Sequence, residues 1–221
     1  MAGFVLVHGA GDVGWYWHLV EAELRARGHE VVSPDLPCDD DSAGLPEYVD
    51  AVVGAVGELR DLVVVAHSFG GLTGPLVCER VGARLLVLTA PMIPVPGEAP
   101  NDYWANTRYE EEQSSYEDTV ALFYQDVPPE LAAEAMRRAP DQSVARMGEP
   151  SPLQAWPDVP TRVLLFRDDR VFTPAFLRRV AEERLGIVPD EMDGGHCAAL
   201  SRPSELADRL EAYAAEQGLV R

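Results

Sequence analysis

Four short apolar runs constrain the fold of this chain more than any other feature. They read FVLV at residues 4–7, LVVV at 62–65, LLVL at 85–88 and VLLF at 163–166. None of them alternates between apolar and polar residues, a pattern typical of strands buried on both faces of a parallel sheet. Two further segments, at 30–33 and 190–192, are weaker strand candidates.

Helix-like segments lie between these runs. Pro174 and Pro203 stand where the first turn of a helix tolerates a missing N–H, and Gly28 stands just after a helical stretch. Alternating strands and helices imply right-handed crossovers. We therefore predict an α/β fold, with a doubly wound, mostly parallel sheet of six strands covered by helices on both faces. The expected helices span residues 15–27, 46–59, 68–81, 174–185 and 203–216.

The alternation stops between residues 91 and 156, where Pro, Glu and aromatic residues accumulate. A helix is expected from residue 128, because acidic residues come early in it and Arg late. We predict that residues 91–156 form a helical cap inserted into a core made of residues 1–90 and 157–221. The aromatic side chains of this cap could line a pocket or pack against one another. They are Tyr103, Trp104, Tyr109, Tyr116, Phe123 and Tyr124.

Composition narrows the class of partner. Asp and Glu number 37 against 18 Lys and Arg, giving a formal charge of -19, which argues against nucleic acid or an anionic membrane surface as a partner. No apolar run approaches the roughly 18 residues of a spanning helix. Cys38, Cys78 and Cys197 form no motif for a disulfide framework or structural zinc. We expect a cytoplasmic protein, monomer or homodimer, that requires neither metal nor cofactor.

The segment LVVVAHSFGGL at residues 62–72 places a serine between a buried strand and a helix. A sharp strand-to-helix turn needs small residues on both sides, and Ala66 and Gly70 meet this need. Such a turn exposes the hydroxyl of Ser68 and places the N–H of Phe69 at a helix N-terminus. The alternative is a serine that only caps the helix.

The segment VHGAGDVGWYW at residues 7–17 follows the first strand. Its H-G-x-G motif and aromatic-led helix resemble the oxyanion loop of α/β hydrolases, in particular the small plant-type methylesterase and hydroxynitrile-lyase branch. The resemblance implies that the N–H groups of Ala10 and Phe69 bind an oxyanion and that His8 braces the loop. It also implies the strand order 2-1-3-4-5-6, with the active site at the carboxyl edge of the sheet. The family usually has glycine where this chain has Ala66.

The base and the acid are expected further along the chain. His196 follows two glycines in MDGGHCAAL, and two aspartates follow a strand in VLLFRDDRVFTP. The spacing of the family favours Asp169, and Asp168 remains the alternative because Phe166 stands where the family often has glycine. The order Ser68, Asp169, His196 is that of α/β hydrolases. His67 is expected to pack rather than to act, and His29 to lie at the surface.

Together these residues predict a serine hydrolase that cleaves an ester, thioester or lactone through an acyl-enzyme on Ser68. Met92, Tyr103 and Trp104 are predicted to line the pocket of a small, apolar or aromatic substrate. A hydroxynitrile lyase would call for a lysine directly after the histidine, where this chain has Cys197. A non-hydrolytic binder or a biosynthetic cyclase on the same scaffold is the other alternative.

Overall fold

The computed structural model describes residues 1–109 and 118–220. Its centre is a parallel sheet of six strands in the order β2-β1-β3-β4-β5-β6. This confirms the fold class and the strand order expected from the sequence. The strands are β1 Gly3–Val7, β2 Glu30–Val32, β3 Leu62–His67, β4 Leu85–Thr89, β5 Thr161–Phe166 and β6 Asp190–Met192.

The four inner strands are buried over most or all of their length. Every residue of β1, β3 and β4 is buried, and β5 is buried over its last four residues. Helices cover both faces of the sheet, so these strands have no solvent face that would need polar residues. The two edge strands are only three residues long and partly exposed, which explains their weaker sequence signal.

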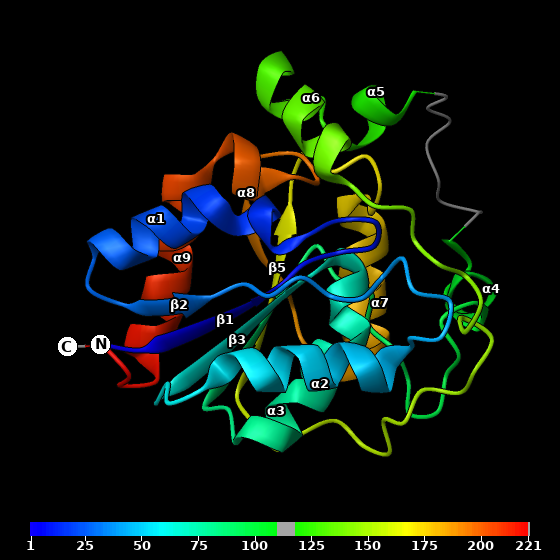
Figure 1. Ribbon diagram of the computed structural model, residues 1–221, viewed down its shortest axis with the longest axis horizontal. Helices are drawn as coiled ribbons and strands as arrows, with labels where there is room; N and C mark the ends of the chain where they lie inside the picture. The colour runs from blue at the N-terminus through cyan, green and yellow to red at the C-terminus, as the bar shows by residue number, and fades with distance from the viewer. Residues whose placement is uncertain (110–117, 221) are drawn as a thin grey trace.

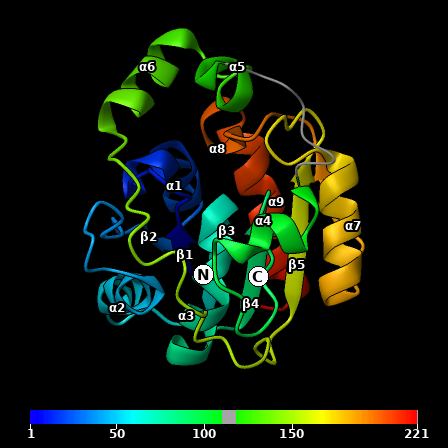
Figure 2. The same cartoon turned by 90° about the vertical axis from the view of Figure 1, so that its right-hand side faces the viewer.

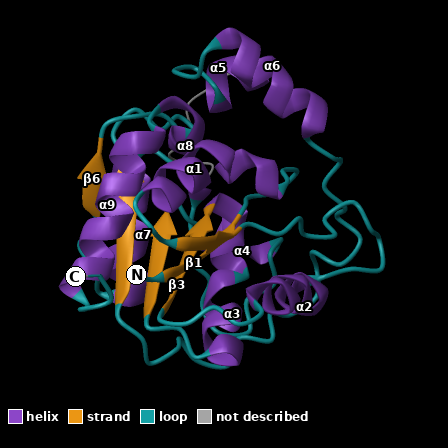
Figure 3. Ribbon diagram, turned by 60° about the vertical axis from the view of Figure 1, so that its left-hand side comes forward, coloured by secondary structure: helices purple, strands orange, loops and turns teal. Residues whose placement is uncertain are grey.

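Two helix pairs cover opposite faces of the sheet (Figure 3). On one face α1, His18–Ala26, packs against α9, Pro203–Glu216, and on the other α2, Leu45–Val56, packs against α3, Gly74–Val81. Helix α7, Pro174–Leu185, packs beside β5. Several of these helices have Pro in the first turn, where its missing N–H costs nothing.

The described residues between β4 and β5 include three short helices: α4 Asp102–Asn106, α5 Thr119–Phe123 and α6 Pro129–Arg138. Helices α5 and α6 stand beyond the sheet, above α8, Ala198–Ser201, in both Figure 1 and Figure 2. Residues 139–160 then return to β5 without a helix or strand. Tyr116, one of the aromatic residues assigned to the cap, lies outside the described residues.

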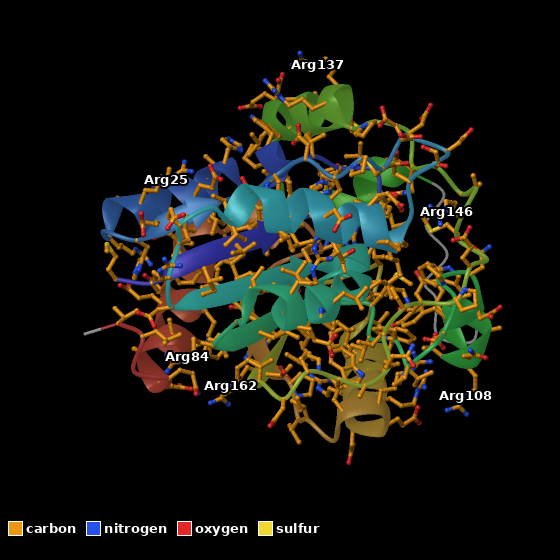
Figure 4. All side chains as sticks on the ribbon, turned by 60° about the horizontal axis from the view of Figure 1, so that its bottom comes forward. Arg25, Arg84, Arg108, Arg137, Arg146 and Arg162 are labelled. Carbon is orange, nitrogen blue, oxygen red and sulfur yellow. The ribbon has the colours of Figure 1, made fainter. Side chains whose placement is uncertain are left out.

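Surface arginines are dispersed over the molecule. The six that Figure 4 labels lie around its outline on different parts of the chain, and each pairs with a carboxylate. Exposed pairs of this kind contribute little to stability. The pairs are Arg25–Glu21, Arg84–Asp61, Arg108–Glu183, Arg137–Glu134, Arg146–Glu149 and Arg162–Glu216.

Among the described residues, no helix combines the length and the apolar character needed to cross a bilayer.

Candidate active site

Ser68 occupies a strained turn at the end of β3. Its φ angle of 53° lies in the left-handed region, which residues other than glycine rarely adopt. A short 3-10 helix, η2 Ser68–Leu72, follows at once. A Cβ on Gly70 would lie 2.7 Å from the carbonyl oxygen of His8, so only glycine fits there. The turn is thus pressed against the loop after β1.

A chain of hydrogen bonds joins Ser68, His196 and Asp169. The hydroxyl Oγ of Ser68 lies 3.0 Å from Nε2 of His196, and Nδ1 of His196 lies 2.9 Å from Oδ2 of Asp169. The side chains of His196 and Asp169 are almost wholly buried. Oδ1 of Asp169 accepts the N–H groups of Val171 and Phe172 at 2.8 and 2.9 Å. Four contacts therefore hold the acid and the imidazole in place.

Asp168, the alternative acid, bonds to a different group. It is exposed, and its Oδ2 accepts the N–H of Gly194 at 3.4 Å. The structure therefore brings Asp169 rather than Asp168 to the imidazole.

The N–H groups of Ala10 and Phe69 have no hydrogen-bond partner within residues 1–109 and 118–220. Both residues line the same cavity as Ser68. His8 supports this loop from behind: its Nε2 accepts the N–H of Leu36 at 3.0 Å, and Nδ1 lies 2.8 Å from the carbonyl oxygen of Gly9. Burial lowers the pKa of His8, so the ring stays neutral, with Nδ1 as donor.

His67 packs beneath the site. Its ring stacks on Tyr16 with centroids 4.7 Å apart, and its Nε2 lies 3.0 Å from the carbonyl oxygen of His196. Burial and the charge of His196 keep the pKa of His67 well below its ordinary value. A neutral His67 that donates this hydrogen bond supports the backbone of His196.

A cavity of about 240 Å³ opens above Ser68. Two of the three predicted pocket residues, Met92 and Trp104, line it. Tyr103 is not among the lining residues: it is fully buried, its hydroxyl accepts the N–H of Ile93 at 3.4 Å, and the guanidinium of Arg184 lies 5.0 Å from its ring centre. The rest of the wall includes Asp12, Phe123, Tyr124, Val171, Phe172 and Cys197.

Sequence reasoning missed four of these wall residues, of which Cys197 directly follows His196. Val171 and Phe172 follow Asp169 directly, and the hydrogen bonds of their N–H groups to its carboxylate turn the chain over the cavity. Asp12 lies in the loop after β1, two residues beyond Ala10. Its place beside the predicted oxyanion donors is the signal that could have identified it.

Gln125 and Asp126, which follow α5, form hydrogen bonds to the loops that carry the site residues. Nε2 of Gln125 donates to the carbonyl oxygen of Asp168 at 2.7 Å. Oδ2 of Asp126 accepts the N–H of Gly195 and the hydroxyl of Ser201, both at 2.8 Å. The segment therefore contacts the loop before His196 as well as covering the cavity.

Known proteins share sequence and fold with this chain. A family model described as the alpha/beta hydrolase family matches residues 4–209. A carbendazim hydrolyzing esterase of a Nocardioides species is 28% identical over 145 residues, which cover 61% of this chain and 52% of the esterase. Methylesterase 3 of Arabidopsis thaliana is 26% identical over 163 residues, 68% of this chain and 61% of that protein. The chain thus aligns with about half to three fifths of these relatives' length.

Solved structures resemble the chain over nearly its whole length. An Arabidopsis methylesterase superposes with a TM-score of 0.79 at 18% identity, covering 98% of this chain and 100% of the other. An extracellular α/β-hydrolase from a Paenibacillus species gives 0.77 at 20% identity, with coverage of 97% and 99%. Since the family model extends from the first strand into the last helix, this chain belongs to the alpha/beta hydrolase family.

Proposed function

We propose that this protein is a serine hydrolase that cleaves carboxylic esters through an acyl-enzyme on Ser68. The observation that carries the proposal is the hydrogen-bonded chain from Ser68 Oγ through His196 to Asp169, with separations of 3.0 and 2.9 Å. Those distances are within reach of proton transfer. Curated relatives named as esterases and methylesterases support the same reaction class.

In the proposed reaction, Nε2 of His196 removes the proton of Ser68 while Oγ attacks the ester carbonyl. The N–H groups of Ala10 and Phe69 bind the oxyanion, and each such donor contributes about 3 kcal/mol in comparable sites. His196 then gives the proton to the leaving alcohol. Water attacks the acyl-enzyme by the same route, which releases the acid and restores Ser68. Asp169 holds the reactive tautomer throughout.

The proposed substrate is a small ester with an apolar or aromatic part. Most of the cavity wall is apolar, and its aromatic residues Trp104, Phe123, Tyr124 and Phe172 offer flat surfaces for such a group. The volume of about 240 Å³ suits a small molecule.

Hydrolysis of 4-nitrophenyl acetate and butyrate by the wild type and by Ser68→Ala tests this proposal. We expect Ser68→Ala to lose at least a thousandfold in kcat/KM, because no other hydroxyl meets His196 Nε2 among the described residues. Ser204→Ala, the same change at an exposed position on α9, is the control and should keep full activity. Equal rates in the wild type and Ser68→Ala would refute the proposal.

Labelling separates the hydrolase from a binder or cyclase on this scaffold. A serine-directed fluorophosphonate should add one mass label to the wild type and none to Ser68→Ala. A wild type that binds small molecules tightly yet takes no label at Ser68 would favour the non-hydrolytic alternative.

A further inference from the structure

Asp12 is a carboxyl group in the wall of the cavity that the proposed mechanism leaves unused. Apart from backbone and catalytic groups, the wall is made mainly of apolar and aromatic side chains. Asp12 is the single acidic residue among the described wall residues, and no Lys or Arg lines the cavity there. Asp12 is half-buried in this wall, where an unpaired charge is costly and a partner of opposite charge would offset that cost.

The hydrogen bonds of Asp12 leave one oxygen free. Oδ1 accepts the N–H of Val13 at 2.9 Å, a bond within its own loop. Oδ2 has no hydrogen-bond partner in the described parts of the chain. A structural role for the side chain would be met by the bond to Val13 alone, for which a neutral Asn would serve as well. This oxygen is not enclosed by the described residues, and Asp12 lines the cavity, so a bound molecule can reach it.

No fixed cation balances Asp12 within the part of the chain that the structure describes. Burial raises its pKa to about 7, and the N–H of Val13 and the nearby His196 oppose this only in part. A positive charge beside the carboxyl group would lower that pKa again and gain its full electrostatic attraction in a poorly solvated site. The titratable groups that face Asp12 are His196, Cys38, Cys197, Tyr16 and Tyr124.

We propose that Asp12 determines substrate specificity by binding a positively charged nitrogen in the ester substrate. The aromatic wall supports this choice, because a cation that contacts Asp12 can also lie against the faces of Trp104 or Tyr124. The formal charge of -19 attracts cations to the molecule as a whole. The inference rests on the proposed ester hydrolysis, and its kinetic test requires that activity. A separate binding test requires no turnover.

The kinetic test compares esters that differ only in charge. For a cation in the acyl part, the pair is 4-nitrophenyl 4-(trimethylammonio)butyrate and 4-nitrophenyl 5,5-dimethylhexanoate. For a cation in the alcohol part, it is butyrylcholine and 3,3-dimethylbutyl butyrate. We expect the wild type to prefer the cationic member at least tenfold in kcat/KM in one pair. Both members of a pair need the same catalytic residues, so their ratio isolates recognition.

Asp12→Asn keeps the acceptor for Val13 and removes the charge. The preference should fall to about twofold, and this ratio is the readout because a change that affects catalysis alters both members of a pair alike. Asp39→Asn removes one charge from an exposed position outside the cavity wall and is the matched control. It should keep the wild-type preference. A wild type with no preference, an unchanged preference in Asp12→Asn, or an equal loss in Asp39→Asn would each overturn the proposal.

The binding test uses phenyltrimethylammonium, which cannot be hydrolysed, and titration calorimetry. We expect its Kd to rise at least fivefold in Asp12→Asn and to stay unchanged in Asp39→Asn. If no ester is hydrolysed in a Ser68-dependent way, the proposed function fails, and this titration still decides the role of Asp12. Ser68-dependent hydrolysis with equal binding by wild type and Asp12→Asn would refute the present inference alone.

Discussion

The methyl group of Ala66 fills the space that a side chain on Gly74 would need: a Cβ built on Gly74 would lie 2.7 Å from the Cβ of Ala66. Ala66 is in β3, and Gly74 is the first residue of α3, the helix that follows the turn at Ser68. Because position 74 has no side chain, β3 and α3 can pack this closely. The close contact sets how near the start of α3 lies to β3.

We predict that Gly74→Ala destabilises the protein by about 1–3 kcal/mol, the usual cost of overpacking a core. The double variant Ala66→Gly/Gly74→Ala moves the methyl group from strand to helix and should recover most of that loss. Urea unfolding of the wild type, both single variants and the double variant measures the coupling. If Gly74→Ala costs as much in the Ala66→Gly background as in the wild type, the contact is not the cause.

This contact also shows what the sequence could predict. Small residues on both sides of Ser68 predicted a sharp turn, and the φ angle of 53° at Ser68 agrees with it. The sequence could not show that Gly74, eight residues beyond Ala66, compensates for the methyl group. The expected continuous helix over 68–81 is also divided, because η2 ends at Leu72 and α3 begins at Gly74 with Pro75 in its first turn.

Long-range contacts account for the other differences. His29 was expected at the surface, yet it is buried, because its Nδ1 accepts the N–H of Ala2 and its Nε2 lies 3.1 Å from Glu211 on α9. Tyr103 was expected in the pocket but packs toward Arg184 on α7. Both outcomes depend on which helix packs against the residue in the folded protein. The local pattern of apolar and polar residues does not contain this information. The strands were predictable because a strand buried on both faces consists of consecutive apolar residues.

Asp169 and the adjacent Asp168 offer a matched pair of substitutions. Asp169→Asn keeps an oxygen for the N–H groups of Val171 and Phe172 but replaces the acceptor at His196 Nδ1, which favours the wrong tautomer. We expect a loss in kcat of about 10⁴-fold, as for the equivalent change in serine proteases. Asp168→Asn, at an exposed side chain, should retain kcat within threefold. Steady-state kinetics on 4-nitrophenyl butyrate would decide, and a larger loss in Asp168→Asn would reverse the assignment.

A buried ion pair joins α7 to the segment after β4. Nη1 and Nη2 of Arg184 contact the two carboxylate oxygens of Glu98 at 2.5 and 2.9 Å, and both side chains are almost fully buried. Removal of one partner leaves the other charge unpaired, so Arg184→Met should destabilise by about 3–5 kcal/mol. Glu98→Gln/Arg184→Met should cost less than the sum of the single changes. Additive losses in thermal or urea unfolding would show that the charges do not interact.

The charge of Asp12 should reduce stability, and the loss should depend on pH. The pKa rises from an ordinary value of 3.8 to about 7 on folding. Between these values the folded protein keeps a proton that the unfolded chain releases, so stability falls as pH rises from 4 to 7. Asp12→Asn avoids this loss and should be more stable than the wild type by up to about 4 kcal/mol at pH 8, and by less at pH 5. Urea unfolding of Asp12→Asn and Asp39→Asn at both pH values measures the difference. The same gain for Asp12→Asn at pH 5 and pH 8 would mean that folding does not raise the pKa of Asp12. The proposed recognition of cations would then lose its support, because it depends on an unpaired charge at this position.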